Sequence, residues 1–206
     1  MEKIDFKQTD KAWYLPSAKA AGLVHLPALP FLMVDGRGHP GQSEEFQPSI
    51  EALYSSAYTL KFMFRNGPKP AGWADFVVPP LESLWWMQDG GDFDVDRPAD
   101  WRWTLMIRVP DFITSAMLED ARNQLRRKKT LPALDGLRLE TFEEGKAVQI
   151  LHIGPYDQEG PAVAQLHAFA AANGLTFCGK HHEIYLSSPG RTAPEKLKTV
   201  VRYPVK

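Results

Sequence analysis

Glu183 and Tyr185 are the residues whose types and spacing most clearly suggest chemistry. They lie in the segment 181–189, whose β-branched and aromatic residues alternate as in a strand. Because alternate residues of a strand face opposite sides, the carboxylate and the phenol share one face, while His182 and Ile184 lie on the other. A carboxylate is costly to bury without a partner, so Glu183 is either solvated or kept for a ligand.

A metal centre is the main competing interpretation of this segment. Its candidate ligands are Cys178, His181, His182 and Glu183. Neighbouring His181 and His182 face opposite sides of a strand and cannot chelate one ion together. We therefore predict no metal and no cofactor. Cys178 is the single cysteine, which permits no intramolecular disulfide and is consistent with a reducing compartment.

Composition indicates an ordinary globular protein. The chain has 206 residues, of which 44% are hydrophobic, and its formal net charge is −1. This balance gives no electrostatic footprint for direct nucleic-acid or membrane binding. The first thirty residues carry charges and no long apolar stretch, so we expect neither a signal peptide nor a spanning helix, and a cytoplasmic location. Nothing indicates an oligomeric state.

The first half of the chain contains signals for three strands and a helix. An apolar strand at 30–34 leads into a glycine-rich turn at 35–41, which lacks the Gly-Lys-Ser/Thr ending of a phosphate-binding loop. A helix is predicted over 43–65, and strands over 81–87 and 101–109. The turn at Asp89-Gly90-Gly91-Asp92 lacks the ligand spacing of a calcium loop.

An aromatic stripe follows the predicted helix. Tyr54, Tyr58 and Phe62 recur at every fourth position and therefore lie on one flank. Such a stripe is usually core, but tyrosines can also line a pocket, where the ring packs against a ligand and the hydroxyl finds a polar atom. Both interpretations stay open at this point.

The second half repeats this sequence of signals after a helix at 113–129, capped by Thr114 or Ser115. A hairpin turn is predicted at 143–146 between two strands, with Gly145 supplying the positive dihedral. A further helix is predicted from Asp157 to the stop at Gly174. The strands of this half are predicted at 137–142, 147–153, 181–187 and 198–205.

The two halves match in order, which predicts an internal duplication. The last strands share the most specific signal, Ile107-Arg108-Val109-Pro110 against Val201-Arg202-Tyr203-Pro204. We therefore expect an α+β fold of two β-α-β-β units related by a pseudo-twofold axis, in which Trp85 corresponds to Tyr185. The expected organisation is an arm at 1–22 and one domain at 23–206, with halves at about 23–110 and 131–206 and a connecting helix at 111–130.

A duplicated β-α-β-β unit with a Glu-Ile-Tyr-Leu strand resembles the GyrI-like (gyrase-inhibitor-like) small-molecule-binding family. The resemblance spans nearly the whole chain. It implies a central ligand cleft between the halves, with Glu183 as the acidic group, Trp85 and Tyr185 as walls, and Tyr54 and Tyr58 closing it. Glu82 is then exposed or structural. The further pieces that resemble stand-alone members are Glu44-Glu45-Phe46, Leu53-Tyr54-Ser55, Met106-Ile107-Arg108, Leu151-His152-Ile153-Gly154, Glu183-Ile184-Tyr185-Leu186 and Pro194-Glu195-Lys196-Leu197-Lys198.

The resemblance implies two possible functions. Stand-alone members have been implicated in hydrolysing cyclopropanoid DNA-alkylating compounds, a detoxification in which Glu183 and Tyr185 would be catalytic. Desolvation by Trp85, Tyr54 and Tyr58 is then expected to raise the pKa of Glu183. The alternative is a non-catalytic multidrug-type binding or sensing module for hydrophobic or cationic aromatic ligands. Because no helix-turn-helix segment precedes the domain, sensing would require a partner regulator.

Overall fold

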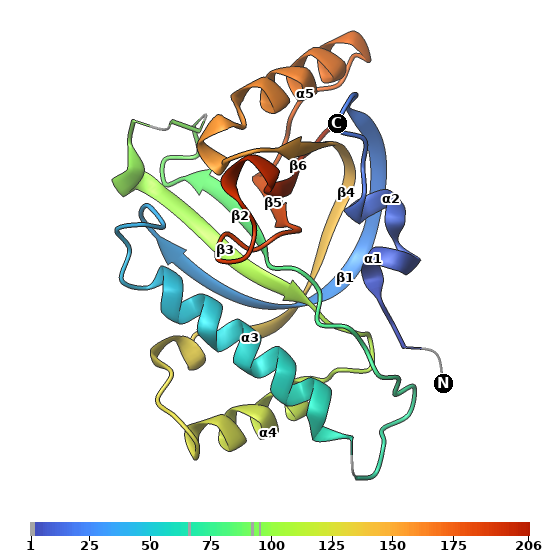
Figure 1. Ribbon diagram of the computed structural model, residues 1–206, viewed down its shortest axis with the longest axis vertical. Helices are drawn as coiled ribbons and strands as arrows, with labels where there is room; N and C mark the ends of the chain where they lie inside the picture. The colour runs from blue at the N-terminus through green and yellow to red at the C-terminus, as the bar shows by residue number, and fades with distance from the viewer. Residues whose placement is uncertain (1–2, 66, 92, 95) are drawn as a thin grey trace. The chain divides into compact units, whose positions relative to one another are not determined.

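The fold combines six strands with a few helices in the parts of the chain that are described. The computed structural model describes residues 3–65, 67–91, 93–94 and 96–206 (Figure 1). The strands are β1 (Gly22–Arg37), β2 (Glu82–Met87), β3 (Trp101–Arg108), β4 (Arg138–Ile153), β5 (His181–Tyr185) and β6 (Lys198–Pro204). The α-helices are α1 (Phe6–Thr9), α2 (Lys11–Tyr14), α3 (Phe46–Met63), α4 (Ser115–Arg126) and α5 (Gly160–Ala172).

The strands are hydrogen-bonded in the order β1-β3-β2-β5-β6-β4. The pairs β1/β3, β4/β6 and β5/β6 are antiparallel. The chain divides into two compact units, the first containing residues 29–79 and 85–142 with the N-terminal residues up to 5, and the second containing 6–28, 80–84 and 143–206. The unit boundaries fall within β1, β2 and β4, and each unit is described by itself.

Strand–helix–strand–strand occurs twice in chain order, as predicted. The first occurrence is β1-α3-β2-β3 and the second is β4-α5-β5-β6, with α4 between them. The predicted cap of α4 is confirmed, because the Thr114 hydroxyl accepts a hydrogen bond from the backbone N–H of Met117 at 3.3 Å. An internal duplication, a pseudo-twofold axis and a central ligand cleft stay predictions.

The hairpin predicted at 143–146 is wrong. β4 runs without interruption from Arg138 to Ile153, and Gly145 lies within it with a φ of 70°. A glycine in this conformation is typical of a β-bulge, which leaves the strand continuous. The turn predicted at 35–41 also begins later than expected, because β1 extends to Arg37. The positive dihedrals of glycine are shared by turns and bulges, so sequence signals alone do not separate them.

An aromatic cluster fills part of the interior of the first unit. Phe46 lies edge-on to the fully buried Trp103, with ring centroids 5.2 Å apart, and is stacked with Trp85 at 6.0 Å. Trp85 also meets Trp101 edge-on at 6.1 Å. Phe46, the first residue of α3, therefore joins that helix to aromatic rings of β2 and β3.

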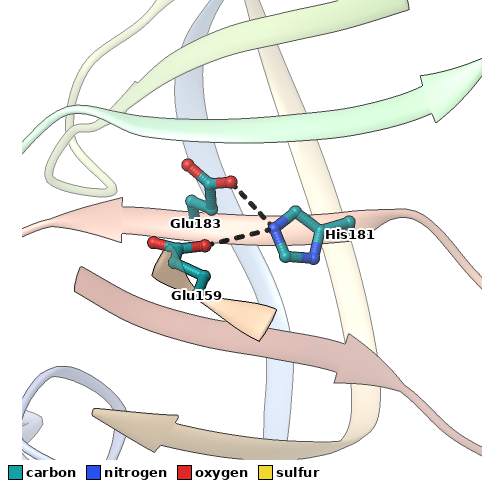
Figure 2. A group of neighbouring side chains, drawn as sticks. All are labelled: Glu159, His181 and Glu183. Carbon is teal, nitrogen blue, oxygen red and sulfur yellow. Dashed lines mark hydrogen bonds and ion pairs between the residues drawn. The ribbon is translucent and has the colours of Figure 1, made fainter. Parts of the chain in front are cut away.

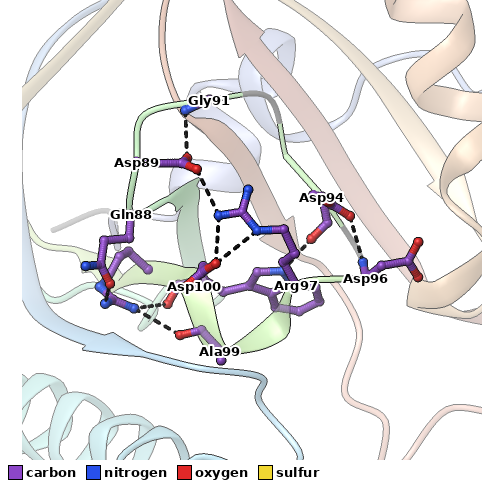
Figure 3. Close-up of polar contacts among 10 residues, drawn as sticks. Gln88, Asp89, Gly91, Asp94, Asp96, Arg97, Ala99 and Asp100 are labelled. Atoms are coloured by element: carbon purple, nitrogen blue, oxygen red, sulfur yellow. Dashed lines mark hydrogen bonds and ion pairs between the residues drawn. The ribbon is translucent and has the colours of Figure 1, made fainter.

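A chain of polar contacts links described residues between β2 and β3 (Figure 3). Arg97 donates hydrogen bonds to Asp89 at 2.8 Å and to Asp100 at 2.7 Å, and Asp89 also accepts from the backbone N–H of Gly91. These bonds lower the pKa of Asp89. The predicted turn at 89–92 includes Asp92, which lies outside the described residues. In the described part, Asp89 is paired with an arginine.

Strands β1 and β3 are closely packed at Gly36. It lies opposite Trp103 in the strand register, and a Cβ atom added to it would overlap the indole ring. We expect Gly36→Ala to lower the free energy of unfolding by about 1–3 kcal/mol, the usual cost of overpacking. Gly22→Ala, in the same strand, is the control, because its added Cβ has no heavy atom within 4 Å. Urea unfolding of both variants checks the difference, and equal stabilities would contradict the packing argument.

A hydrophobic cluster joins α5 to the strands of the second unit. Its buried residues come from β4, α5 and the end of the chain, and Phe169, Phe177 and Tyr203 pack against it. This cluster holds one side of β6, the strand that pairs with β5. The buried members are Val148, Ile150, Ala162, Leu166, Val201 and Val205.

A buried ionic network holds β5 in the second unit. The two ring nitrogens of His182 lie 3.0 Å from carboxylate oxygens of Glu82 and Glu144. Arg202 donates to Glu144 at 2.9 Å, and the Tyr14 hydroxyl donates to Glu82 at 3.0 Å. Because both imidazole nitrogens face carboxylates, both donate, and His182 carries a positive charge. The cations His182 and Arg202 thus balance the anions Glu82 and Glu144.

The network decides between the two interpretations of Glu82, exposed or structural, in favour of the structural one. Its side chain is only 2% exposed, because residues far away in sequence supply its hydrogen-bond donors. Burial raises the pKa of Glu144, but the charges of His182 and Arg202 outweigh burial and lower that pKa to about 2. Burial lowers the pKa of His182, and Glu144 and Glu82 outweigh it and raise that pKa to about 9. Glu144 and His182 are therefore both ionised at neutral pH.

We expect Glu144→Gln to destabilise the protein by about 3–5 kcal/mol, because removing one partner of a buried ion pair leaves charge uncompensated. Glu143→Gln is the matched control, since Glu143 is the exposed neighbour in the same strand. Denaturant unfolding at neutral pH measures both variants. A loss below about 1 kcal/mol for Glu144→Gln, the scale of exposed pairs, would contradict the role given to the network.

Candidate functional site

The alternation predicted for β5 is confirmed. His182 and Ile184 are each 1% exposed, while Glu183 and Tyr185 are only partly buried and lie on the other face. His181 shares the face of Glu183, because the two residues are two positions apart. The network around His182 fixes one face of the strand and leaves the other face available for a site.

Three side chains gather on that other face (Figure 2). The Nε2 atom of His181 lies 2.8 Å from Glu183 Oε1 and 3.9 Å from Glu159 Oε2, as the dashed lines show. Glu159 immediately precedes α5, and its side chain, like that of His181, is 9% exposed. One ligand atom from each of the three residues lies within 4.8 Å of the others. This set of residues is called the carboxyl–imidazole cluster below.

The two carboxyl groups of the cluster have opposite pKa shifts. Burial, together with the nearby charge of Glu183, raises the pKa of Glu159 to about 9. Burial also raises the pKa of Glu183, but hydrogen bonds from His181 and Tyr185 and the charge of His181 outweigh it, so the net direction is down. The Glu183 direction is opposite to the expected one, because sequence reasoning included desolvation and omitted the imidazole 2.8 Å away. Such a split provides one protonated and one ionised carboxyl at neutral pH.

Three tyrosine rings of the second unit lie near the cluster. The Tyr185 hydroxyl lies 2.7 Å from the Ser83 hydroxyl, and its ring meets Tyr156 edge-on at 5.4 Å. The ring of Tyr203 lies 4.8 Å from that of His181 and is stacked on Phe177 at 4.5 Å. Burial and the charges of Glu183 and Glu159 raise the pKa values of Tyr156 and Tyr203, so both phenols stay neutral. Neutral aromatic surface beside a carboxylate suits planar or cationic ligands.

The other predicted ligand-binding residues lie in the first unit. Trp85 is buried within the aromatic cluster at 5% exposure. Tyr54 is partly buried and stacks on Tyr58 at 6.5 Å, and Tyr58 is 47% exposed. Whether these three residues share a cleft with Glu183 stays a prediction.

Sequence reasoning missed Glu159, Tyr156 and Tyr203. It also treated His181 only as half of a histidine pair, although alternation already placed it on the face of Glu183. Glu159 gave no such signal, because it precedes a helix and no periodicity relates it to β5. The metal-ligand set considered from sequence differs from the cluster, since Cys178 is exposed and His182 belongs to the buried network.

No helix in the described parts of the chain is both long and apolar enough to cross a lipid bilayer. No curated protein matches the chain significantly.

Several solved structures match the chain. An uncharacterised conserved protein from Listeria innocua is 43% identical, with a TM-score of 0.92, and the match covers 99% of this chain and 100% of the other. A hydrolase from the same organism is 41% identical, with a TM-score of 0.91 and full coverage of both chains.

The fold also extends to more distant proteins. The C-terminal domain of EcmrR matches 90% of this chain and 96% of its own length at 14% identity, with a TM-score of 0.57. That likeness concerns the fold alone. The model of the GyrI-like small molecule binding domain matches residues 22–206, which include every strand and the whole carboxyl–imidazole cluster. The chain therefore belongs to the GyrI-like small-molecule-binding domain family.

Proposed function

We propose that this protein is a cofactor-independent hydrolase that binds hydrophobic aromatic compounds and opens cyclopropanoid rings by adding water, which detoxifies the electrophile. The observation that carries the proposal is the Glu183 carboxylate, held 2.8 Å from His181 on the strand face that also presents Tyr185. Two relatives in the family, both hydrolases from Listeria innocua, are 41% and 40% identical and support a hydrolytic reaction.

Glu183 is the proposed general base. Water attacks the strained CH₂ carbon of a cyclopropane conjugated to a carbonyl, and Glu183 accepts the proton that the water loses. A carbon–oxygen bond forms as a ring carbon–carbon bond breaks, and that electron pair moves through the conjugated system to the carbonyl oxygen. The proton that Glu183 accepted then passes through solvent to that oxygen, which completes the addition of water and returns Glu183 to its ionised form. Because hydrogen bonds lower the pKa of Glu183, it is ionised at neutral pH and ready to act.

Tyr185 is the proposed stabiliser of the developing oxyanion. Its hydroxyl is positioned by the Ser83 hydroxyl at 2.7 Å. When Ser83 donates in this pair, the Tyr185 proton, which bonds to Glu183 without substrate, can turn from Glu183 to the substrate oxygen on which negative charge develops. The rings of Tyr185 and Tyr156 supply the apolar surface against which an aromatic substrate packs.

We expect Glu183→Gln to slow single-turnover ring opening by about 10²–10⁴-fold, the usual contribution of a general base. Glu195→Gln, an exposed substitution in the same unit, should react like the wild type. Mass spectrometry that follows addition of water to a cyclopropanoid substrate measures the rate. Wild-type protein that binds the compound but forms no adduct above the buffer rate would leave only binding.

We expect Tyr185→Phe to slow the same reaction by about 10²–10³-fold, because a lost oxyanion donor weakens transition-state stabilisation. Ligand affinity should change little, since the ring that packs against the substrate is kept. Ser83→Ala removes the hydroxyl that positions the Tyr185 hydroxyl, so it partly tests whether that positioning matters for the reaction. A Tyr185→Phe variant that loses affinity and keeps the full single-turnover rate would assign Tyr185 to binding instead of chemistry.

Binding without turnover, as in a sensing module that acts with a partner regulator, is the second candidate function. It is favoured by the carboxylate among neutral tyrosine rings, which suits a cationic planar ligand as well as an electrophile. We expect Glu183→Gln to weaken binding of a cationic planar dye by at least about tenfold, the loss of roughly one charge-assisted contact. A neutral dye of the same shape is the control. Equal losses for both dyes in fluorescence titrations would show that charge does not determine affinity.

A further inference from the structure

The carboxyl–imidazole cluster contains an unsatisfied oxygen. Glu159 Oε1 is buried and has no hydrogen-bond partner of normal geometry among the described residues, and the neighbouring Thr199 hydroxyl, which lowers the pKa of Glu159, is likewise buried and unpartnered. The side chain that carries it is 91% buried, and its other oxygen lies 3.9 Å from His181 Nε2. Buried carboxyl oxygens in native proteins are normally satisfied, so an unpartnered one beside an imidazole and a second carboxylate indicates a missing ligand. This feature is not used by the proposed hydrolysis.

The charges of the cluster point to the kind of ligand. With the Glu159 proton and the hydrogen on His181 Nε2 removed, the three side chains form a buried ligand set that carries two negative charges. The nearest cation of the strand, His182, is on the opposite face and is held by Glu82 and Glu144. A divalent cation would neutralise the cluster, displacing the proton of Glu159 and the hydrogen on His181 Nε2.

The donor atoms and their spacing narrow the choice of cation. One imidazole nitrogen and two carboxylate oxygens are ligands that Zn²⁺ and Co²⁺ accept, whereas Mg²⁺ prefers oxygen ligands and keeps its water. At metal–ligand distances of about 2.0–2.2 Å, ligand atoms lie roughly 3.2–3.6 Å apart in a tetrahedral site. The atoms of the cluster already lie within 4.8 Å of one another, with His181 and Glu183 at 2.8 Å. Small side-chain rotations are therefore enough to bring the three ligand atoms to the spacing of a metal site.

We propose that Glu159, His181 and Glu183 form a binding site for a divalent transition-metal ion such as Zn²⁺, with the remaining coordination position open to water or a ligand. The site does not depend on the proposed hydrolysis. A bound ion would coordinate the Glu183 carboxylate and lower its basicity, which weakens it as a base for water activation. Metal and proton are thus alternative occupants, and added Zn²⁺ should inhibit ring opening.

The test is titration of chelator-treated full-length protein with Zn²⁺ and Co²⁺, with Mg²⁺ for comparison. Cys178→Ser is the background for every sample, because an exposed thiol binds zinc by itself. We expect one equivalent of Zn²⁺ or Co²⁺ by calorimetry, a visible absorption band of bound Co²⁺, and no binding of Mg²⁺ at the same concentration. Glu159→Gln and His181→Gln should each weaken binding more than about tenfold, since even outer-shell changes cost 10–100-fold.

Two substitutions outside the cluster control for loss of charge or imidazole. Glu195 and His25 are both exposed in the second unit, so Glu195→Gln and His25→Gln should bind as the background does. Circular dichroism shows whether each variant is folded. If Glu159→Gln does not fold, His181→Gln and the anomalous scattering of Zn²⁺-soaked crystals of the background decide the question.

Unchanged affinity in the folded cluster variants, or an anomalous peak elsewhere, would overturn the metal site. Zinc binding by protein that never opens a cyclopropanoid ring would refute the hydrolase and leave the metal site standing. If the protein binds no zinc at the cluster and zinc does not inhibit its ring opening, the metal site is refuted and the hydrolase stands.

Discussion

The positive charge of His182 is the constraint on which the second unit depends. A histidine between two carboxylates in a buried place must donate from both nitrogens, so β5 is held at one register and one rotation. Arg202, directly opposite His182 on β6, shares the carboxylate of Glu144 and ties the neighbouring strand to the same charge. Because residues of a strand alternate, fixing His182 on one face places His181 and Glu183 on the other.

The two faces of β5 therefore use the same residue types in different ways. On the face of His182, acid and base are matched in number and every charge has a partner. On the face of His181, two carboxyl groups meet one imidazole, and the imbalance appears as a split in their pKa values. Such an imbalance is expected where a chain keeps groups for proton transfer or for a ligand, since a purely structural cluster gains stability from complete pairing.

Much of this arrangement could be predicted from local patterns, and the rest depends on contacts between distant segments. Alternation placed Glu183 and Tyr185 correctly, and helix signals located α3 and α4. Gly145 was misassigned because a bulge and a turn require the same dihedral. Glu82 looks solvent-accessible in isolation, but Tyr14 and His182 cover it in the fold. Glu159 approaches β5 from outside the strand, so no local pattern could place it. The direction of the Glu183 pKa shift required knowing that the imidazole of His181, on the same strand face, comes within 2.8 Å.

Residues 6–21 lie outside the region that matches the family, yet they contribute to the interior of the second unit. The Tyr14 hydroxyl reaches Glu82, and the backbone carbonyl of Trp13 accepts from Arg202 at 2.6 Å. A fragment trimmed to the family boundary would keep all six strands and lose two hydrogen bonds from its buried charges. The boundary drawn from sequence similarity thus leaves out a segment that supplies hydrogen-bond partners to the buried charges of the second unit.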